Sequence, residues 1–262
     1  MLGAIIGDIV GSRFEFNNIK TKDFEFMPDS CFFTDDSVLT IAVAKAILDS
    51  GKNPEKLGDL TVSSMQEIGR PYPYCGYGGM FRKWMYSDNP QPYGSYGNGS
   101  AMRVSSCGYA ADSLEEAIVL SKIVTKITHN HQEGIKGAEA TTVAVFMALN
   151  GKDISDIKKH INENYYPMDF TLNEIRDSYK FNEICQDTVP QGIMAFLESN
   201  DFEDAVRNAI SIGGDSDTLG AIAGGIAGAY YGISDSLREK VLDFLDDRLL
   251  YILLEFENKY LK

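Results

Sequence analysis

The chain has 262 residues, 44% of them hydrophobic and 24% charged, which is typical of a globular protein with room for a substantial core. Its formal net charge of −14 argues against broad binding to nucleic acid or to an anionic membrane, although a local site can still hold a small anion. We expect one domain over residues 1–262, acting as a monomer without nucleic-acid or membrane partners.

The cysteines and the N-terminal segment indicate the compartment. The four cysteines have no paired spacing, so we interpret them as free thiols in a reducing environment. Residues 1–8 lack a basic segment, and Asp8 interrupts their apolar run, so they do not resemble a signal peptide. The apolar stretch 219–233 is shorter than the roughly 20 residues of a membrane span. These features predict a cytoplasmic protein.

Helical patterns follow one another along the chain, and strand signals are sparse. Residues 1–12 carry glycines at a spacing of four, and residues 220–228 repeat that spacing, so we expect the two segments to pack against each other or against a common neighbour. The predicted fold class is all-α, a compact multi-helix bundle. Further helices are expected at about residues 35–50, 55–70, 114–129, 133–149, 191–197, 202–210, 219–231 and within 234–260, with another start at 101–104.

Two acidic clusters stand just ahead of predicted helices. One lies at residues 34–36 (TDD), and the other lies in residues 211–220 (SIGGDSDTLG). Carboxylates beside hydroxyls are hard oxygen ligands, which suit Mg²⁺, Mn²⁺ or Ca²⁺ better than zinc or copper. A helix cap explains the second cluster alone equally well, and it is the better explanation of Asp35 and Asp36 taken alone. Two such clusters share a metal site only if the fold brings them together.

A loop rich in glycine and tyrosine covers residues 70–100. Successive backbone N–H groups in residues 94–99 (GSYGNG) can cradle a phosphate, although an ordinary turn-rich connection explains the composition too. The loop is not a Walker loop, because the Gly-Lys-Ser/Thr ending is absent. His129 and His131 lack a third soft ligand, so we interpret His129 as a hydrogen-bonding residue.

Four stretches, taken together and in order, resemble the ADP-ribosylglycohydrolase family, which includes the dinitrogenase-reductase-activating glycohydrolase and the ADP-ribosyl-acceptor hydrolases. The resemblance implies an all-helical bundle, in agreement with the periodicity. The stretches span nearly the whole chain. They are residues 7–15 (GDIVGSRFE), 33–37 (FTDDS), 94–104 (GSYGNGSAMRV) and 213–218 (GGDSDT).

The resemblance also implies a site and a reaction. It implies hydrolysis of the bond between ADP-ribose and an acceptor, with two divalent metals, Mg²⁺ or Mn²⁺, orienting the distal ribose. Attack by water would use the metals, Glu15 or an aspartate, so the general base stays open between Glu15 and the metal-binding acids. The implied metal ligands are Thr34, Asp35, Asp36, Asp215, Asp217 and Thr218. The implied ADP-ribose contacts are Gly94, Ser95, Tyr96, Asn98, Gly99 and His129. The implied catalytic residues are Glu15, Asp35, Asp36 and Asp217.

Acceptor choice stays open among arginine, serine, O-acetyl-ADP-ribose and a small molecule. Residues 130–133 (NHQE) replace prolines that many members carry after the histidine. Two other functions compete with the hydrolase. One is a Mg²⁺-dependent phosphatase using Asp215 and Asp217 as an Asp-x-Asp motif, which would require a buried β-strand before the motif. The other is an ADP-ribose-binding protein without catalysis.

Overall fold

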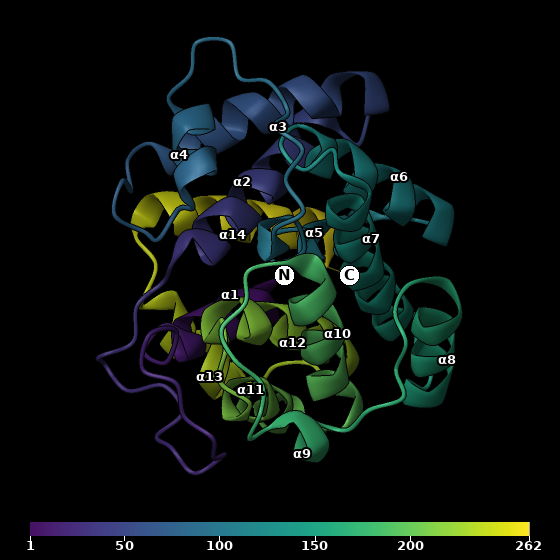
Figure 1. Ribbon diagram of the computed structural model, residues 1–262. Helices are drawn as coiled ribbons and strands as arrows, with labels where there is room; N and C mark the ends of the chain where they lie inside the picture. Colours follow the sequence, from purple (N-terminus) through teal and green to yellow (C-terminus); the bar gives the residue numbers. More distant parts are fainter. Residues whose placement is uncertain (262) are drawn as a thin grey trace.

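The computed structural model describes residues 1–261, and every regular element within them is helical (Figure 1). The β-pairing in this part of the chain is a single isolated bridge between Gly97 and Ile184. The all-α prediction is confirmed, whereas the strand that the phosphatase alternative requires is not found there. The helices are α1 (Leu2–Gly11), α2 (Asp35–Ser50), α3 (Pro54–Gly69), α4 (Gly79–Met85), α5 (Ser105–Ala110), α6 (Leu114–Lys126), α7 (Gln132–Leu149), α8 (Ile154–Asn164), α9 (Leu172–Ile175), α10 (Cys185–Leu197), α11 (Phe202–Ser211), α12 (Ser216–Tyr230), α13 (Asp235–Leu242) and α14 (Asp247–Tyr260), with a 3-10 turn at Asn98–Ser100.

Helices α1 and α12 form the central pair of the bundle, and their backbones meet through glycines. A Cβ atom on Gly7 would lie 1.9 Å from the carbonyl oxygen of Gly220, and one on Gly3 would lie 2.2 Å from that of Gly224. No side chain fits at these positions, so the glycine spacing reflects a helix contact, as predicted. The contact fixes the start of α12 beside the end of α1.

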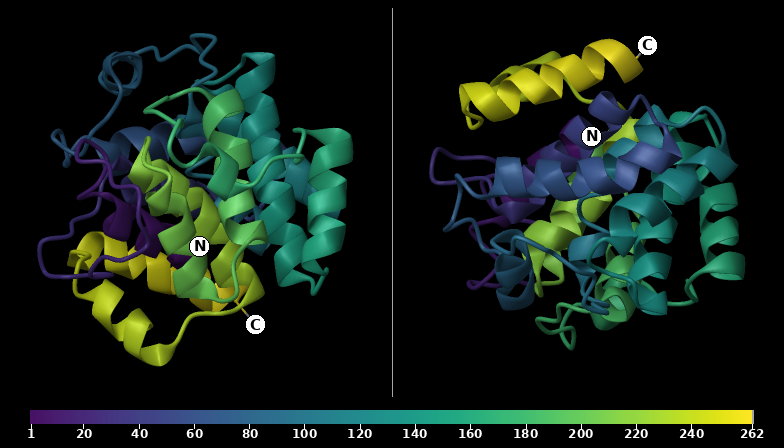
Figure 2. Two further views of the ribbon diagram at one scale, coloured as in Figure 1. Left: turned by 60° about the horizontal axis from the view of Figure 1, so that its bottom comes forward. Right: turned by 90° about the horizontal axis from the view of Figure 1, so that it is seen from above.

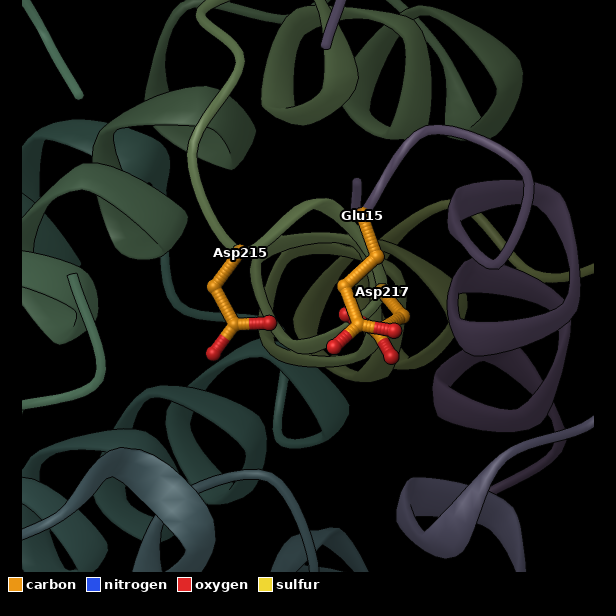
Figure 3. A group of neighbouring side chains, drawn as sticks. All are labelled: Glu15, Asp215 and Asp217. Carbon is orange, nitrogen blue, oxygen red and sulfur yellow. The ribbon is translucent and has the colours of Figure 1, made fainter. Parts of the chain in front are cut away.

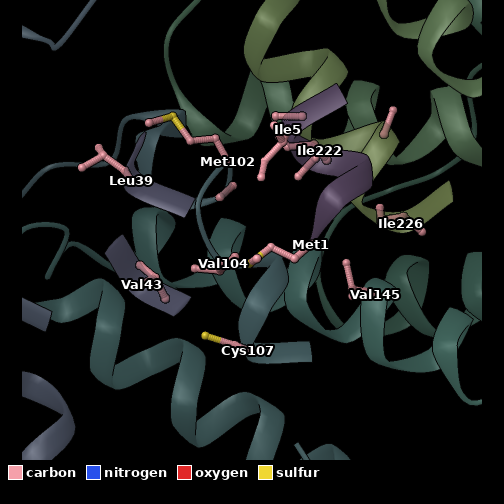
Figure 4. Close-up of a cluster of buried hydrophobic side chains, with 14 of the residues drawn as sticks. Met1, Ile5, Leu39, Val43, Met102, Val104, Cys107, Val145, Ile222 and Ile226 are labelled. Carbon is pink, nitrogen blue, oxygen red and sulfur yellow. The ribbon is translucent and has the colours of Figure 1, made fainter. Parts of the chain in front are cut away.

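Other helices surround this pair. Helices α2, α7, α10 and α11 pack around it, and α14 lies across α2 at the edge of the bundle (Figure 2). The core between them includes Ile5 from α1, Val43 from α2, Val145 from α7 and Ile222 from α12 (Figure 4). No helix among residues 1–261 combines the length and apolar content that crossing a bilayer requires.

Several expected boundaries are wrong. Residues 101–104 form a turn, and the helix begins at Ser105. The segment 234–260 is two helices, because Asp246 accepts hydrogen bonds from the N–H groups of Arg248 and Leu249 and starts α14 anew. Helix α10 begins at Cys185 and tolerates Pro190 in its second turn. Helices α4, α8 and α9 were not expected; α8 lies in a polar segment and buries only Ile157 and Ile161.

Candidate active site

The two acidic clusters lie on one cavity of about 650 Å³. The N-terminal ends of α2 and α12 face this cavity, together with the segment after α1 and the loop around residues 93–99. The fold therefore brings together residues that stand about 180 positions apart in the chain, such as Asp36 and Thr218, whose hydroxyl lies 3.4 Å from Asp36 Oδ2. The acidic residues that line the cavity are Glu15, Asp35, Asp36, Glu183, Asp215 and Asp217.

Asp8, a buried residue of α1, holds the first turn of α2. Its Oδ2 accepts hydrogen bonds from the N–H groups of Thr34 and Ser37, each at 3.0 Å, and from the Ser37 hydroxyl. Its Oδ1 accepts a 2.7 Å hydrogen bond from the Thr34 hydroxyl. Thr34 also caps α2, since its oxygen accepts from the N–H of Asp36. Asp8 thus fixes the backbone that carries Asp35 and Asp36, a role that no sequence pattern indicates.

The start of α12 is held from the opposite side by Asn18. The N–H of Gly214 donates to Asn18 Oδ1 at 2.7 Å, and Asn18 Nδ2 donates to the carbonyl groups of Gly214 and Glu15 at 2.8 and 2.9 Å. Gly214 has a φ of +83°, which favours glycine. Asn18 therefore ties the backbone of Glu15 to the turn that presents Asp215. Sequence reasoning missed Asn18, because nothing distinguishes it from another polar loop residue.

Glu15, Asp215 and Asp217 form a compact group of carboxylates (Figure 3). One oxygen from each lies within 4.8 Å of the others, and the Glu15 side chain hangs from the loop after α1 with its carboxylate beside that of Asp217. Asp217 and Asp215 are buried, and Glu15 is half-buried. Asp215 Oδ2 accepts a 2.7 Å hydrogen bond from Asn98 Nδ2.

Burial and repulsion between neighbouring carboxylates raise the pKa values of Glu15, Asp215 and Asp217, and also that of Asp36. Burial, followed by repulsion from Asp217, raises the pKa of Glu15 to about 8. Burial likewise raises the pKa of Asp215 to about 6 and holds those of Asp36 and Asp217 well above their ordinary range. Neutralising so many buried carboxylates requires protons or cations.

Divalent metal ions fit this set of donors. Asp36 Oδ1 is buried and has no hydrogen-bond partner, although a buried acceptor normally has one. All the candidate ligands are carboxylate or hydroxyl oxygens, the donor class that Mg²⁺ and Mn²⁺ prefer. Five of the six predicted ligands line the cavity: Asp35 and Asp36 at the start of α2, and Asp215, Asp217 and Thr218 at the start of α12. Thr34 is not among the lining residues, and its hydroxyl donates to Asp8 and accepts from the N–H of Asp36.

We expect Mn²⁺ or Mg²⁺ to stabilise the protein more at pH 8 than at pH 6. The raised pKa values mean that the metal-free folded state holds protons that the unfolded chain has lost, so these groups stabilise it at low pH and lose that contribution as the pH rises towards about 8. Metal must displace the same protons, so its affinity rises over this range. Thermal unfolding with Mn²⁺ or EDTA at both pH values measures this, and a metal effect that shrinks towards pH 8 would contradict it.

The glycine-rich loop also lines the cavity. It is held in place by contacts with other segments, because the N–H groups of Gly94 and Asn98 donate to Asn130 Oδ1 and the Glu183 carbonyl group at 2.7 Å each. Those two N–H groups are therefore engaged within the protein. Ser95, Tyr96 and Gly99 line the cavity beside them, and their contact with a ligand stays a prediction.

Two residues in or after this loop have contacts that the sequence did not indicate. Asn98, which was predicted to contact the ligand, lines the cavity, and its buried side-chain amide donates to Asp215 and Thr188. Arg103 lines the cavity, is almost fully buried and donates to Thr128. A buried arginine shows no sequence signal, since arginines are mostly exposed.

Comparison with known proteins gives one consistent result. The sequence model of the family described as ADP-ribosylglycohydrolase matches residues 1–258. The chain is 26% identical to ADP-ribosylhydrolase ARH3 of Bos taurus, covering 89% of this chain and 84% of that protein. It is 25% identical to ADP-ribosylarginine hydrolase Tri1 of Pseudomonas putida (strain GB-1), covering 89% and 70%. A solved structure described as an ADP-ribosylglycohydrolase-related protein complex superposes with a TM-score of 0.70 at 21% identity, covering 99% of this chain and 96% of that one, which shows a shared fold.

Proposed function

From the premise that the chain belongs to the ADP-ribosylglycohydrolase family, we propose that it hydrolyses the bond between ADP-ribose and an acceptor group with the help of two divalent metal ions, Mg²⁺ or Mn²⁺. The observation that carries the proposal is the single cavity on which both acidic clusters and the glycine-rich loop meet. Its volume of about 650 Å³ lies in the range of pockets for small organic ligands.

The lining of the cavity offers groups that suit two parts of ADP-ribose. Ser95, Tyr96 and Gly99 offer polar groups and a ring, which suit a diphosphate and its flanking groups. The carboxylates of Asp35, Asp36, Asp215 and Asp217 line the same cavity. The ribose with the scissile bond therefore belongs beside these carboxylates, where the metals would be held.

Metal ions bound by the six ligands would supply positive charge that holds the ribose hydroxyl groups and polarises water. The protein's own groups then divide the remaining work. Asp8 and Asn18 keep the two ligand clusters in place, and the carboxylates stabilise positive charge that develops on the sugar ring. Glu15 faces Asp217 from the loop above, where it can accept a proton from the attacking water.

Release of free ADP-ribose tests the proposal. Matched peptides carrying ADP-ribose on arginine or on serine are incubated with the protein in Mg²⁺, in Mn²⁺ and in EDTA. We expect metal-dependent release from one of them, which also identifies the acceptor bond. Binding of ADP-ribose without release from any conjugate, O-acetyl-ADP-ribose included, would favour a binding protein. Neither binding nor release would overturn the proposed function.

Glu15→Gln should lower the turnover of the cleaved conjugate by roughly 10²–10⁴-fold, because an amide cannot accept the proton from water. The affinity for free ADP-ribose should change only a few-fold, since the shape of the side chain is kept. Glu183→Gln is the matched control, because it removes the same charge from the same cavity. If Glu15→Gln lowers turnover and ADP-ribose affinity equally, or if the two variants lose the same turnover, Glu15 does not act in the chemical step.

A further inference from the structure

His129 ends a buried chain of polar groups that begins at Arg103. Arg103 Nη2 donates to the hydroxyl oxygen of Thr128 at 2.7 Å, and that oxygen lies 2.7 Å from His129 Nδ1. The exposed fractions of Arg103, Thr128 and His129 are 1%, 0% and 5%, so water does not compete for these contacts. Arg103 and His129 both line the cavity, and Thr128 links them.

The direction of the hydrogen bonds follows from the donors present. A guanidinium group only donates, so the Thr128 oxygen accepts from Arg103. Apart from Arg103, which cannot accept, His129 Nδ1 at 2.7 Å is the hydrogen-bond partner that the described residues offer to the hydroxyl of Thr128 and its single proton. The hydroxyl therefore donates to Nδ1, and a neutral imidazole with an occupied lone pair on Nδ1 carries its proton on Nε2.

The charge of the ring agrees with this arrangement. Burial, with a smaller contribution from the neighbouring Arg103, holds the pKa of His129 well below its ordinary value. Burial lowers the pKa of Arg103 only to about 10, so the arginine stays charged at neutral pH. A positively charged imidazole beside the Arg103 guanidinium is unfavourable. The His129 ring is therefore neutral and carries one proton, on either Nδ1 or Nε2.

The free edge of the ring faces the glycine-rich loop. A Cβ atom on Gly97 or Gly99 would lie 3.7 or 3.8 Å from His129 Nε2, so glycine leaves the ring edge open at both positions. The neighbouring Tyr93 ring lies 6.2 Å away, centroid to centroid. Nε2 is thus directed to the part of the cavity where the loop would hold a ligand.

We propose that the Arg103–Thr128 pair fixes His129 in the tautomer with the proton on Nε2, so that the ring donates a hydrogen bond to a phosphate or hydroxyl oxygen of the ligand. This rests on the proposed function for the identity of the ligand, ADP-ribose, but the tautomer itself does not. Arg103 and Thr128 are positioning residues, because they act on the ligand only through His129.

Nitrogen-15 NMR of the imidazole rings tests the tautomer directly. The chain has only three histidines, and His131→Gln and His160→Gln variants assign their signals. In the unaltered protein without ligand we expect His129 with a protonated Nε2 and an unprotonated Nδ1. A proton on Nδ1, or on both nitrogens at pH 7, would overturn the proposal. This reading is taken on the unaltered protein, so it does not depend on whether a variant folds.

Thr128→Val and Thr128→Ser separate the hydroxyl from the shape of the side chain. Valine removes the donor to Nδ1, so the proton should spread over both ring nitrogens and the affinity for ADP-ribose should fall roughly 10-fold. Serine keeps the hydroxyl, so Thr128→Ser should show the proton on Nε2 and the affinity for ADP-ribose of the unaltered protein. A valine variant with the unaltered tautomer contradicts the chain of hydrogen bonds. The expected tautomer in a protein that does not bind ADP-ribose would instead overturn the proposed ligand and function.

Discussion

Asp217→Asn should abolish turnover while making the metal-free protein more stable. The amide keeps the shape of the side chain and can still accept the 3.0 Å hydrogen bond from the N–H of Thr218. It removes, however, a buried acid that repels Asp36, whose pKa is raised first by burial and then by repulsion from Asp217. We expect turnover to fall about 10³-fold or more, because a ligand and its charge are lost at the site that holds the metals.

Two measurements separate this result from simple damage. In EDTA at pH 8 the thermal unfolding temperature should rise, since the amide needs neither a buried charge nor the uptake of a proton at this position. In Mn²⁺ the unaltered protein should gain stability and the variant should gain little. Asp247→Asn, an exposed acid in the first turn of α14, is the control and should change neither result. A variant that is less stable in EDTA but responds normally to Mn²⁺ would show that Asp217 acts as a structural cap.

Gly7→Ala should destabilise the protein by about 1–3 kcal/mol or more, because the new methyl group would lie 1.9 Å from the backbone oxygen of Gly220. Backbone atoms cannot rotate away, so α1 and α12 must separate. For a chain of this size each kcal/mol lowers the unfolding temperature by roughly 2–4 °C. The separation also moves Asp8 relative to Asp217, so the stabilisation by Mn²⁺ should shrink.

Gly58→Ala is the matched control for this prediction. Gly58 lies within α3, and a Cβ atom there would meet only a methyl group of Ile123 at 3.8 Å, an ordinary contact. Alanine is the better helix former by roughly 1 kcal/mol, so this variant should be as stable as the original or more stable. If both variants lose stability equally, the close approach of α1 and α12 does not explain the loss.

The helical class and most long helices could be predicted from local signals in the sequence. Thr34 and Gly51 marked the ends of α2, and the glycine spacing predicted the contact between α1 and α12. The grouping of the acidic clusters had no local signal, since helix capping explains each cluster alone; it was predicted from the order of the four family stretches. The residue assignments at the site stay predictions that the experiments above address.

The supporting residues had no such signal. Asp8 looked like an acid interrupting an apolar helix, yet it accepts four hydrogen bonds from the first turn of α2. Asn18 and Arg103 act through partners far along the chain, such as Gly214 and Thr128, and pairs of this kind exist only once the chain has folded. Asn98 was recognised by its motif, but its hydrogen bond to Asp215 could not be predicted, because the two residues meet only in the folded chain.

The contact between α1 and α12 sets the order of events during synthesis. About 200 residues separate the end of α1 from the start of α12, so a ribosome adding roughly 5–20 residues per second needs about 10–40 s to supply the partner. All ten residues of α1 are buried in the folded protein. In the nascent chain, α1 lacks α12, the helix that covers it in the folded protein, until α12 has been synthesised. We therefore expect α1 to leave apolar surface exposed on the emerging polypeptide, and the proposed active site to form only after α12 has left the exit tunnel and packed against α1.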